Sequence, residues 1–129
     1  MDVFEFDYYQ RLKKDYNKHK SLFVAFDYDN TVHDYHNLNI DYTAIIELLR
    51  TCEALGFILI LFTANEGEDL KVVLNDLKKR SIPFHHINKN PIMDTRKPYY
   101  NILLDDRAGL KESFDQLKKL TDEIRNNKV

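Results

Sequence analysis

Acidic side chains follow two short apolar runs of the sequence in a pattern that suits metal chemistry. The run SLFVAF is followed by DYDNT, which supplies Asp27 and Asp29. The later run NILL is followed directly by Asp105 and Asp106. Four carboxylates gathered in one place repel one another unless a cation lies among them, and hard oxygen ligands of this number suit Mg²⁺. The sequence therefore predicts a magnesium site.

Further side chains extend this site toward phosphoryl chemistry. Thr63 follows the apolar run LILF, and Lys97 lies between the third and fourth apolar runs. Magnesium commonly bridges carboxylates to a substrate phosphate, while Lys and Thr hold the remaining phosphate oxygens. Asp27 can attack phosphorus directly, and Asp29, two residues on, can transfer protons. A turn-forming role is common for one such residue, but it would have to be invoked four times here.

The elements that must position these side chains follow from apolar periodicity. Continuous β-prone runs predict strands over 21–26, 57–62, 82–87 and 101–104. Apolar residues three and four apart predict helices over 4–20, 45–52, 70–77 and 110–124. Strands that alternate with helices imply a parallel sheet covered on both faces, a three-layer α/β Rossmann-like sandwich. Ligands of such sheets bind beyond the carboxyl ends of the strands, where the acidic segments fall.

Length and composition indicate one globular domain. The 129 residues suffice for a single core, with residues 1–20 as an N-terminal helical extension and 21–129 as the catalytic domain. No stretch approaches the ~20 apolar residues of a membrane span, so no membrane association is expected. The net charge of −2 gives no general field for a polyanion. We expect a cytoplasmic protein in which Cys52, the lone cysteine, is a reduced buried thiol.

The ordered segments DYDNT, LFTAN, KPYY and NILLDD resemble the motifs of the haloacid dehalogenase-like hydrolases. The resemblance runs from Leu22 to about Leu120. It implies that the first strand lies between the second and the fourth. It also implies that Asp27 is the nucleophile and a magnesium ligand. Asp29 would be the general acid and base and would offer its backbone carbonyl to the metal.

The same resemblance assigns the remaining site residues. Thr63 and Lys97 would bind the phosphoryl group, with Lys89 in INKNP as the rival lysine. Asp105 would ligate magnesium directly, and Asp106 would ligate it or hold one of its waters. A subgroup of very small members often has Arg two residues after the motif Thr, where this chain has Asn65.

The resemblance also bears on the substrate. Only 31 residues separate Thr31 from Thr63, which leaves no room for the cap domain that many relatives carry. A capless site in this family is compatible with large substrates such as nucleic-acid ends or phosphoproteins, with subunits that cover one another, and with small nucleotides. The activity implied is magnesium-dependent hydrolysis of phosphate monoesters through an aspartyl-phosphate, with nucleotides or nucleic-acid ends favoured as substrates. The oligomeric state is left open.

Two other interpretations of the function stay open. One is a non-catalytic regulator of the same fold that binds phosphate or metal without turnover, although Asp29 favours hydrolysis. Another is an interaction role for the aromatic N-terminal segment, which is compatible with catalysis. His85 and His86 are interpreted as structural, because adjacent residues of a strand point to opposite faces and cannot easily share one metal ion.

Overall fold

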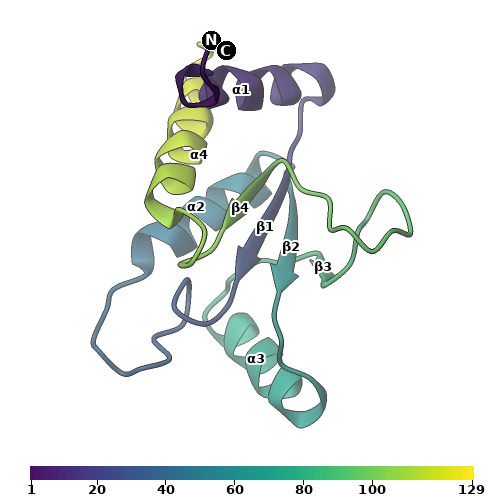
Figure 1. Cartoon of the computed structure of the whole chain (residues 1–129). Helices are drawn as coiled ribbons and strands as arrows, with labels where there is room; N and C mark the ends of the chain where they lie inside the picture. Colours follow the sequence, from purple (N-terminus) through teal and green to yellow (C-terminus); the bar gives the residue numbers. More distant parts are fainter.

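The computed structural model describes all 129 residues, and helices and strands alternate along the chain (Figure 1). A short 3₁₀ turn at Val3–Glu5 precedes the first helix. The helices are α1 (Tyr8–His19), α2 (Thr43–Ala54), α3 (Gly67–Lys79) and α4 (Leu110–Arg125), and the strands are β1 (Phe23–Asp27), β2 (Ile58–Phe62), β3 (His86–Ile87) and β4 (Ile102–Leu104). Every predicted element is present, but the strand predicted over 82–87 is reduced to its last two residues.

The four strands form one sheet in the order β3–β2–β1–β4, and all pairs are parallel. β1 thus lies between β2 and β4, as predicted. Asp27 pairs with Phe62, and Phe26 pairs with Leu104, so three strands end at about the same level. Segments that follow the strands therefore leave at one end of the sheet, the carboxyl end. Segments that precede the strands enter at the opposite, amino end.

The main core lies between one face of the sheet and the helices. Val24 and Phe26 project from β1 into this core and are fully buried. They lie in one apolar cluster with Leu59 and Leu61 of β2, Leu104 of β4, Leu48, Leu49 and Cys52 of α2, Val73 and Leu77 of α3, and Leu117 and Leu120 of α4. Burial of this apolar area is the main stabilising term of the fold. Cys52 is the buried free thiol that the sequence predicted.

The opposite face of the sheet is covered by the segment 88–100 and not by a helix. The ring of Tyr99 packs edge-on against Phe23 with centroids 5.6 Å apart, and Tyr100 packs against Phe62 at 6.0 Å. Figure 1 shows this segment, in green, as the loop that joins β3 to β4 along the chain. Both faces are therefore covered, and the fold is the predicted three-layer α/β Rossmann-like sandwich, with a non-helical third layer.

A histidine side chain extends the short strand β3. The backbone N–H of His85 donates to the Leu59 carbonyl (2.8 Å), and the Leu59 N–H donates to His85 Nδ1 (2.9 Å). Because Nδ1 accepts, the proton of the neutral ring lies on Nε2, which is 3.1 Å from a carboxylate oxygen of Glu53. The imidazole nitrogen thus accepts the hydrogen bond that a backbone carbonyl accepts in a regular parallel ladder. The structural interpretation of His85 is confirmed.

The N-terminal helix packs into the same core as the rest of the chain. Tyr9 and Leu12 of α1 belong to the main apolar cluster. The ammonium of Lys119 in α4 lies 4.2 Å from the centre of the Tyr9 ring, and Lys13 pairs with Glu123 at 3.1 Å. The two chain ends meet where α1 crosses α4 (Figure 1). None of the helices has both the length and the apolar character needed to cross a membrane.

Candidate active site

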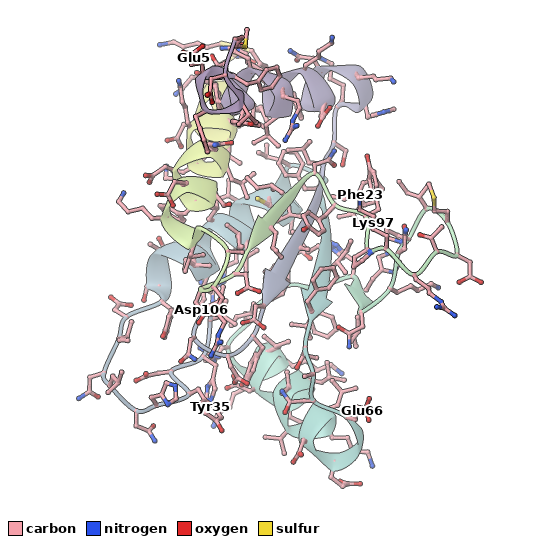
Figure 2. The ribbon with its side chains drawn as sticks, viewed as in Figure 1. Glu5, Phe23, Tyr35, Glu66, Lys97 and Asp106 are labelled. Atoms are coloured by element: carbon pink, nitrogen blue, oxygen red, sulfur yellow. The ribbon has the colours of Figure 1, made fainter.

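Three carboxylates meet at the carboxyl end of the sheet. Asp27 is the last residue of β1, and Asp105 and Asp106 directly follow β4. One carboxylate oxygen from each lies within 4.8 Å of the others. Figure 2 shows Asp106 below the end of β4, next to the loop that follows β1. Adjacent parallel strands therefore bring together acidic groups that are about 80 residues apart in the sequence.

The electrostatics of this cluster are unfavourable without a cation. Partial burial raises the pKa of Asp27 from 3.8 to about 7, and the negative charge of Asp105 and a hydrogen bond with Asp106 add to the effect. No Lys or Arg forms an ion pair with any of the three. Three mutually repelling oxygen donors without an internal counter-charge suit a hard divalent cation such as Mg²⁺.

The turn after β4 fixes the carboxylate of Asp105. The backbone N–H of Arg107 donates to Asp105 Oδ1 (2.8 Å), and the N–H of Ala108 donates to the Asp105 carbonyl (3.0 Å). Gly109, with φ +63°, then adopts the left-handed conformation that starts α4. One oxygen of Asp105 is thus held by the backbone, and the other is free for a ligand.

The loop after β1 is tied to the segment after β4 and to the last turn of α3. The hydroxyl of Thr31 is fully buried and accepts a hydrogen bond from the Asp106 N–H (3.1 Å). Tyr28 donates to Asp76 of α3, and Arg80 donates to the Val32 carbonyl (2.8 Å). Thr31 therefore joins the two acidic segments, a role that its place in DYDNT did not reveal.

Asp29 is not part of the carboxylate cluster. Of the four predicted acidic ligands, the structure brings together the side chains of Asp27, Asp105 and Asp106 only. The backbone of Asp29 pairs with His33 in an isolated bridge, and the neighbouring Asn30 has φ +60°. The Asp29 side chain is half-buried and makes no hydrogen bond within the chain. The Asp29 carboxylate therefore has no hydrogen-bond partner within the chain. It lies two residues after Asp27 in the sequence.

Thr63 lies at the end of β2 in a cluster of amide side chains. Its hydroxyl oxygen accepts hydrogen bonds from the backbone N–H (3.1 Å) and the side-chain amide (2.8 Å) of Asn65. The Asn88 side chain accepts from the Thr63 N–H (2.9 Å) and donates to the Thr63 carbonyl (2.7 Å). The sequence singled out Thr63 but not Asn88, whose position directly after β3 is the signal that could have found it.

The two candidate lysines lie on the two limbs of the segment that joins β3 to β4. These limbs contact each other, since the Asn90 side chain donates to the Lys97 carbonyl (3.5 Å). Lys97 is in the limb that leads into the amino end of β4, and neither lysine forms an ion pair with the carboxylates. Lys89 follows Asn88 at the carboxyl end of β3. It lines a cavity of about 190 Å³ together with Phe62, the residue paired with Asp27.

A loop connects the first acidic segment to α2. Residues 33–42 form no helix or strand. Asp34 organises the loop by accepting hydrogen bonds from the N–H groups of Leu38 (3.1 Å) and Asn39 (2.8 Å). Tyr35 and Leu38 are exposed.

Comparisons with known proteins identify a solved structure with a similar fold. No protein-family model matches the chain, and no curated protein matches it. Among solved structures, the chain is similar to a conserved protein from Bacteroides thetaiotaomicron, with a TM-score of 0.61 and 23% sequence identity. The match covers 84% of this chain and 93% of that chain. At this identity the likeness shows the fold alone, an α/β sandwich shared over nearly the whole domain.

Proposed function

We propose that the chain is a magnesium-dependent phosphate-monoester hydrolase of the haloacid dehalogenase-like type, with Asp27 as its nucleophile. One observation carries the proposal. The carboxylates of Asp27, Asp105 and Asp106 lie within 4.8 Å of one another at the carboxyl end of a parallel sheet. Thr63 follows the next strand, and Lys89 the one beyond it. Carboxylates, a hydroxyl and an ammonium are the groups that a phosphoryl-transfer site uses.

The side chains of Asp27, Asp105 and Asp106 would hold the metal, together with the backbone carbonyl of Asp29. The donor set fits, because all ligands are oxygens and the carboxylates have no internal counter-cation. Bound Mg²⁺ supplies positive charge to the nucleophile and the phosphate oxygens. Metal binding also favours the ionised form of Asp27, which is the form that attacks.

The reaction proceeds in two displacements at phosphorus. An oxygen of Asp27 forms a bond to phosphorus while the ester P–O bond breaks, and Asp29 gives its proton to the departing alcohol oxygen. Asp29, now ionised, takes a proton from water as the water oxygen attacks phosphorus. The bond between phosphorus and Asp27 then breaks, which releases inorganic phosphate and restores the carboxylate.

Thr63 and Lys89 hold the remaining phosphoryl oxygens in this account. Lys89 takes the role first assigned to Lys97, because a residue that follows a parallel strand lies at the same end of the sheet as Asp27. Its ammonium neutralises charge on the phosphoryl group, and the Thr63 hydroxyl donates one hydrogen bond. Asp29 has no partner within the chain and is free to meet the leaving group.

The substrate class follows from the open site. No domain covers the carboxylates, and the loop 33–42 beside them exposes Tyr35 and Leu38. An uncovered site accepts phosphates attached to large leaving groups as well as to small ones. We therefore propose phosphate monoesters of nucleotides and of nucleic-acid ends as the substrates to test first.

The test is release of inorganic phosphate from mononucleotides, sugar phosphates, phosphopeptides and oligonucleotides phosphorylated at the 3′ or 5′ end. Each is assayed with magnesium and with a chelator, for the wild type and for Asp27→Asn. We expect magnesium-dependent release that the variant loses. A folded Asp27→Asn protein with wild-type turnover contradicts the mechanism. Magnesium binding without release from any substrate would favour the non-catalytic regulator.

A further inference from the structure

The Thr63 hydroxyl is held in an unusual hydrogen-bonding state. A threonine hydroxyl has one proton to donate and two lone pairs that accept. Both lone pairs of Thr63 are used by Asn65, one by its backbone N–H at 3.1 Å and one by its side-chain amide at 2.8 Å. The oxygen therefore has no accepting capacity left.

The hydroxyl proton of Thr63 has no acceptor within the chain. Several other threonine hydroxyls donate to carbonyl oxygens, as Thr51 does to Glu47 (3.1 Å) and Thr121 does to Lys118 (3.0 Å). The Thr63 oxygen only accepts. Its O–H bond must point away from the two donors of Asn65, toward solvent or a ligand that accepts. An anionic oxygen is such a ligand, whereas a metal ion, which needs a lone pair, is not.

The backbone of Thr63 is fixed as well. The Asn88 side chain makes hydrogen bonds to both the N–H (2.9 Å) and the carbonyl (2.7 Å) of Thr63. Asn88 itself has φ +49°, and its own N–H donates to the Leu61 carbonyl (2.8 Å), which anchors it to β2. Lys89 is bonded directly to this clamped residue. The Thr63 hydroxyl and the backbone of Lys89 therefore belong to one hydrogen-bonded frame.

We infer that Asn65 is a positioning residue that makes the Thr63 hydroxyl a dedicated hydrogen-bond donor to the phosphoryl oxygens of the ligand. The inference rests on the proposed function, which supplies the phosphoryl group. Asn65 acts through Thr63 and does not contact the ligand. Its contribution to ligand binding must therefore disappear when the hydroxyl of Thr63 is absent.

A double-mutant cycle tests this dependence. The proteins are the wild type, Thr63→Val, which removes the hydroxyl at nearly constant shape, Asn65→Leu, which removes the amide, and the double variant. The measurement is the dissociation constant of inorganic phosphate in the presence of Mg²⁺, by titration calorimetry. Asn75→Leu is the matched control, since Asn75 is exposed on α3 and makes no side-chain hydrogen bond. Thermal unfolding verifies that each protein is folded.

We expect Thr63→Val to weaken phosphate binding about tenfold, the loss of one hydrogen bond to a charged group. Asn65→Leu weakens it by about three- to tenfold, and the double variant binds no more weakly than Thr63→Val. Asn75→Leu binds as the wild type does.

Two results would overturn the inference while leaving the proposed function intact. In one, Asn65→Leu binds phosphate as tightly as the wild type while Thr63→Val does not. In the other, the losses of the two single variants multiply in the double variant. If the wild type itself binds no phosphate, the proposed function fails and the inference falls with it.

Discussion

The two ends of the sheet use polar side chains in different ways. At the amino end, Asn101 accepts a hydrogen bond from the Phe23 N–H (2.7 Å) and donates to Asp15 (3.4 Å), so its amide links the start of β1 to α1. At the carboxyl end, Asp27 and Asp106 face each other across the neighbouring strands, and the cluster has no internal cation. Polar groups at the first end satisfy one another, whereas the three carboxylates at the second have no Lys or Arg partner.

The difference teaches that strand direction decides which residues can serve the site. Lys89 and Lys97 are eight residues apart in the same non-helical segment. Lys89 has just left the carboxyl end of β3, and Lys97 is approaching the amino end of β4. The predictions below test this contrast, beginning with the largest expected effect.

Replacement of each lysine by methionine gives the sharpest contrast. Lys89→Met removes the ammonium next to the phosphoryl group, and we expect kcat/KM for phosphate release to fall about 100-fold. Lys97→Met removes the same charge from the segment that leads into β4, and kcat/KM should change by less than about twofold. The reverse order of effects would return the phosphate-binding role to Lys97.

Asp106→Asn tests the acidic cluster at nearly constant shape. Loss of one carboxylate weakens the attraction for the metal, so the Mg²⁺ concentration for half-maximal activity should rise about tenfold. Asp69→Asn, an exposed position in the first turn of α3, is the matched control and should leave this concentration unchanged. Equal magnesium requirements in the wild type and Asp106→Asn would exclude Asp106 from the metal site.

Asn101→Ala tests the amino end. It leaves the Phe23 N–H without its partner in a partly buried position, which should lower the free energy of unfolding by about 2 kcal/mol. Because Asn101 lies away from the carboxylates, kcat should stay within about twofold of the wild type. Urea unfolding and phosphate release measure the two quantities. A large loss of kcat without a loss of stability would contradict the division between the two ends.

Asp27→Asn should also remove part of the pH dependence of the free energy of unfolding in the absence of metal. The folded pKa of Asp27 is raised to about 7 from 3.8, so the folded chain keeps a proton that the unfolded chain has lost. Wild-type stability therefore falls as pH rises from about 4 to about 7. Asparagine does not ionise, so at pH 8 in EDTA the variant should be more stable by about 1 kcal/mol, discounted for partial exposure.

Urea unfolding at pH 5 and pH 8 in EDTA measures this effect. The advantage of Asp27→Asn should be larger at pH 8 than at pH 5. Addition of magnesium should reduce it, because the metal stabilises the ionised carboxylate of the wild type. An advantage that is the same at both pH values would mean that burial and the neighbouring Asp105 and Asp106 do not raise the pKa of Asp27.

Much of the architecture was predictable from apolar periodicity. The runs before Asp27 and Asp105 are short and continuous, as in buried parallel strands, and both acidic segments were correctly placed at the ends of strands. The third layer was not predictable, because Tyr99 and Tyr100 cover the sheet from a segment without periodicity. The shortness of β3 depends on the His85 side chain replacing part of the ladder.

The candidate site was predictable where an acidic residue stands at the end of an apolar run that forms a strand, as for Asp27, Asp105 and Asp106. It was less predictable where a role depends on a contact between distant segments. Thr31 supports Asp106 from 75 residues away, and Asn88 supports Thr63 from 25 residues away. Neither contact leaves a spacing signal in the sequence. The preference for Lys89 over Lys97 depends on the direction of β3 and β4. The sequence spacing between each lysine and Asp105 does not provide this direction.

The most direct test of the account is to trap the phosphorylated enzyme. The wild type is mixed with its best substrate and magnesium, quenched in acid within milliseconds to seconds, digested, and analysed by mass spectrometry. We predict one phosphoryl group on the peptide that contains Asp27, absent from Asp27→Asn and from samples without magnesium. Steady phosphate release with no phosphoryl group on this peptide, or with the label on another residue, would contradict the assignment of Asp27 as the nucleophile.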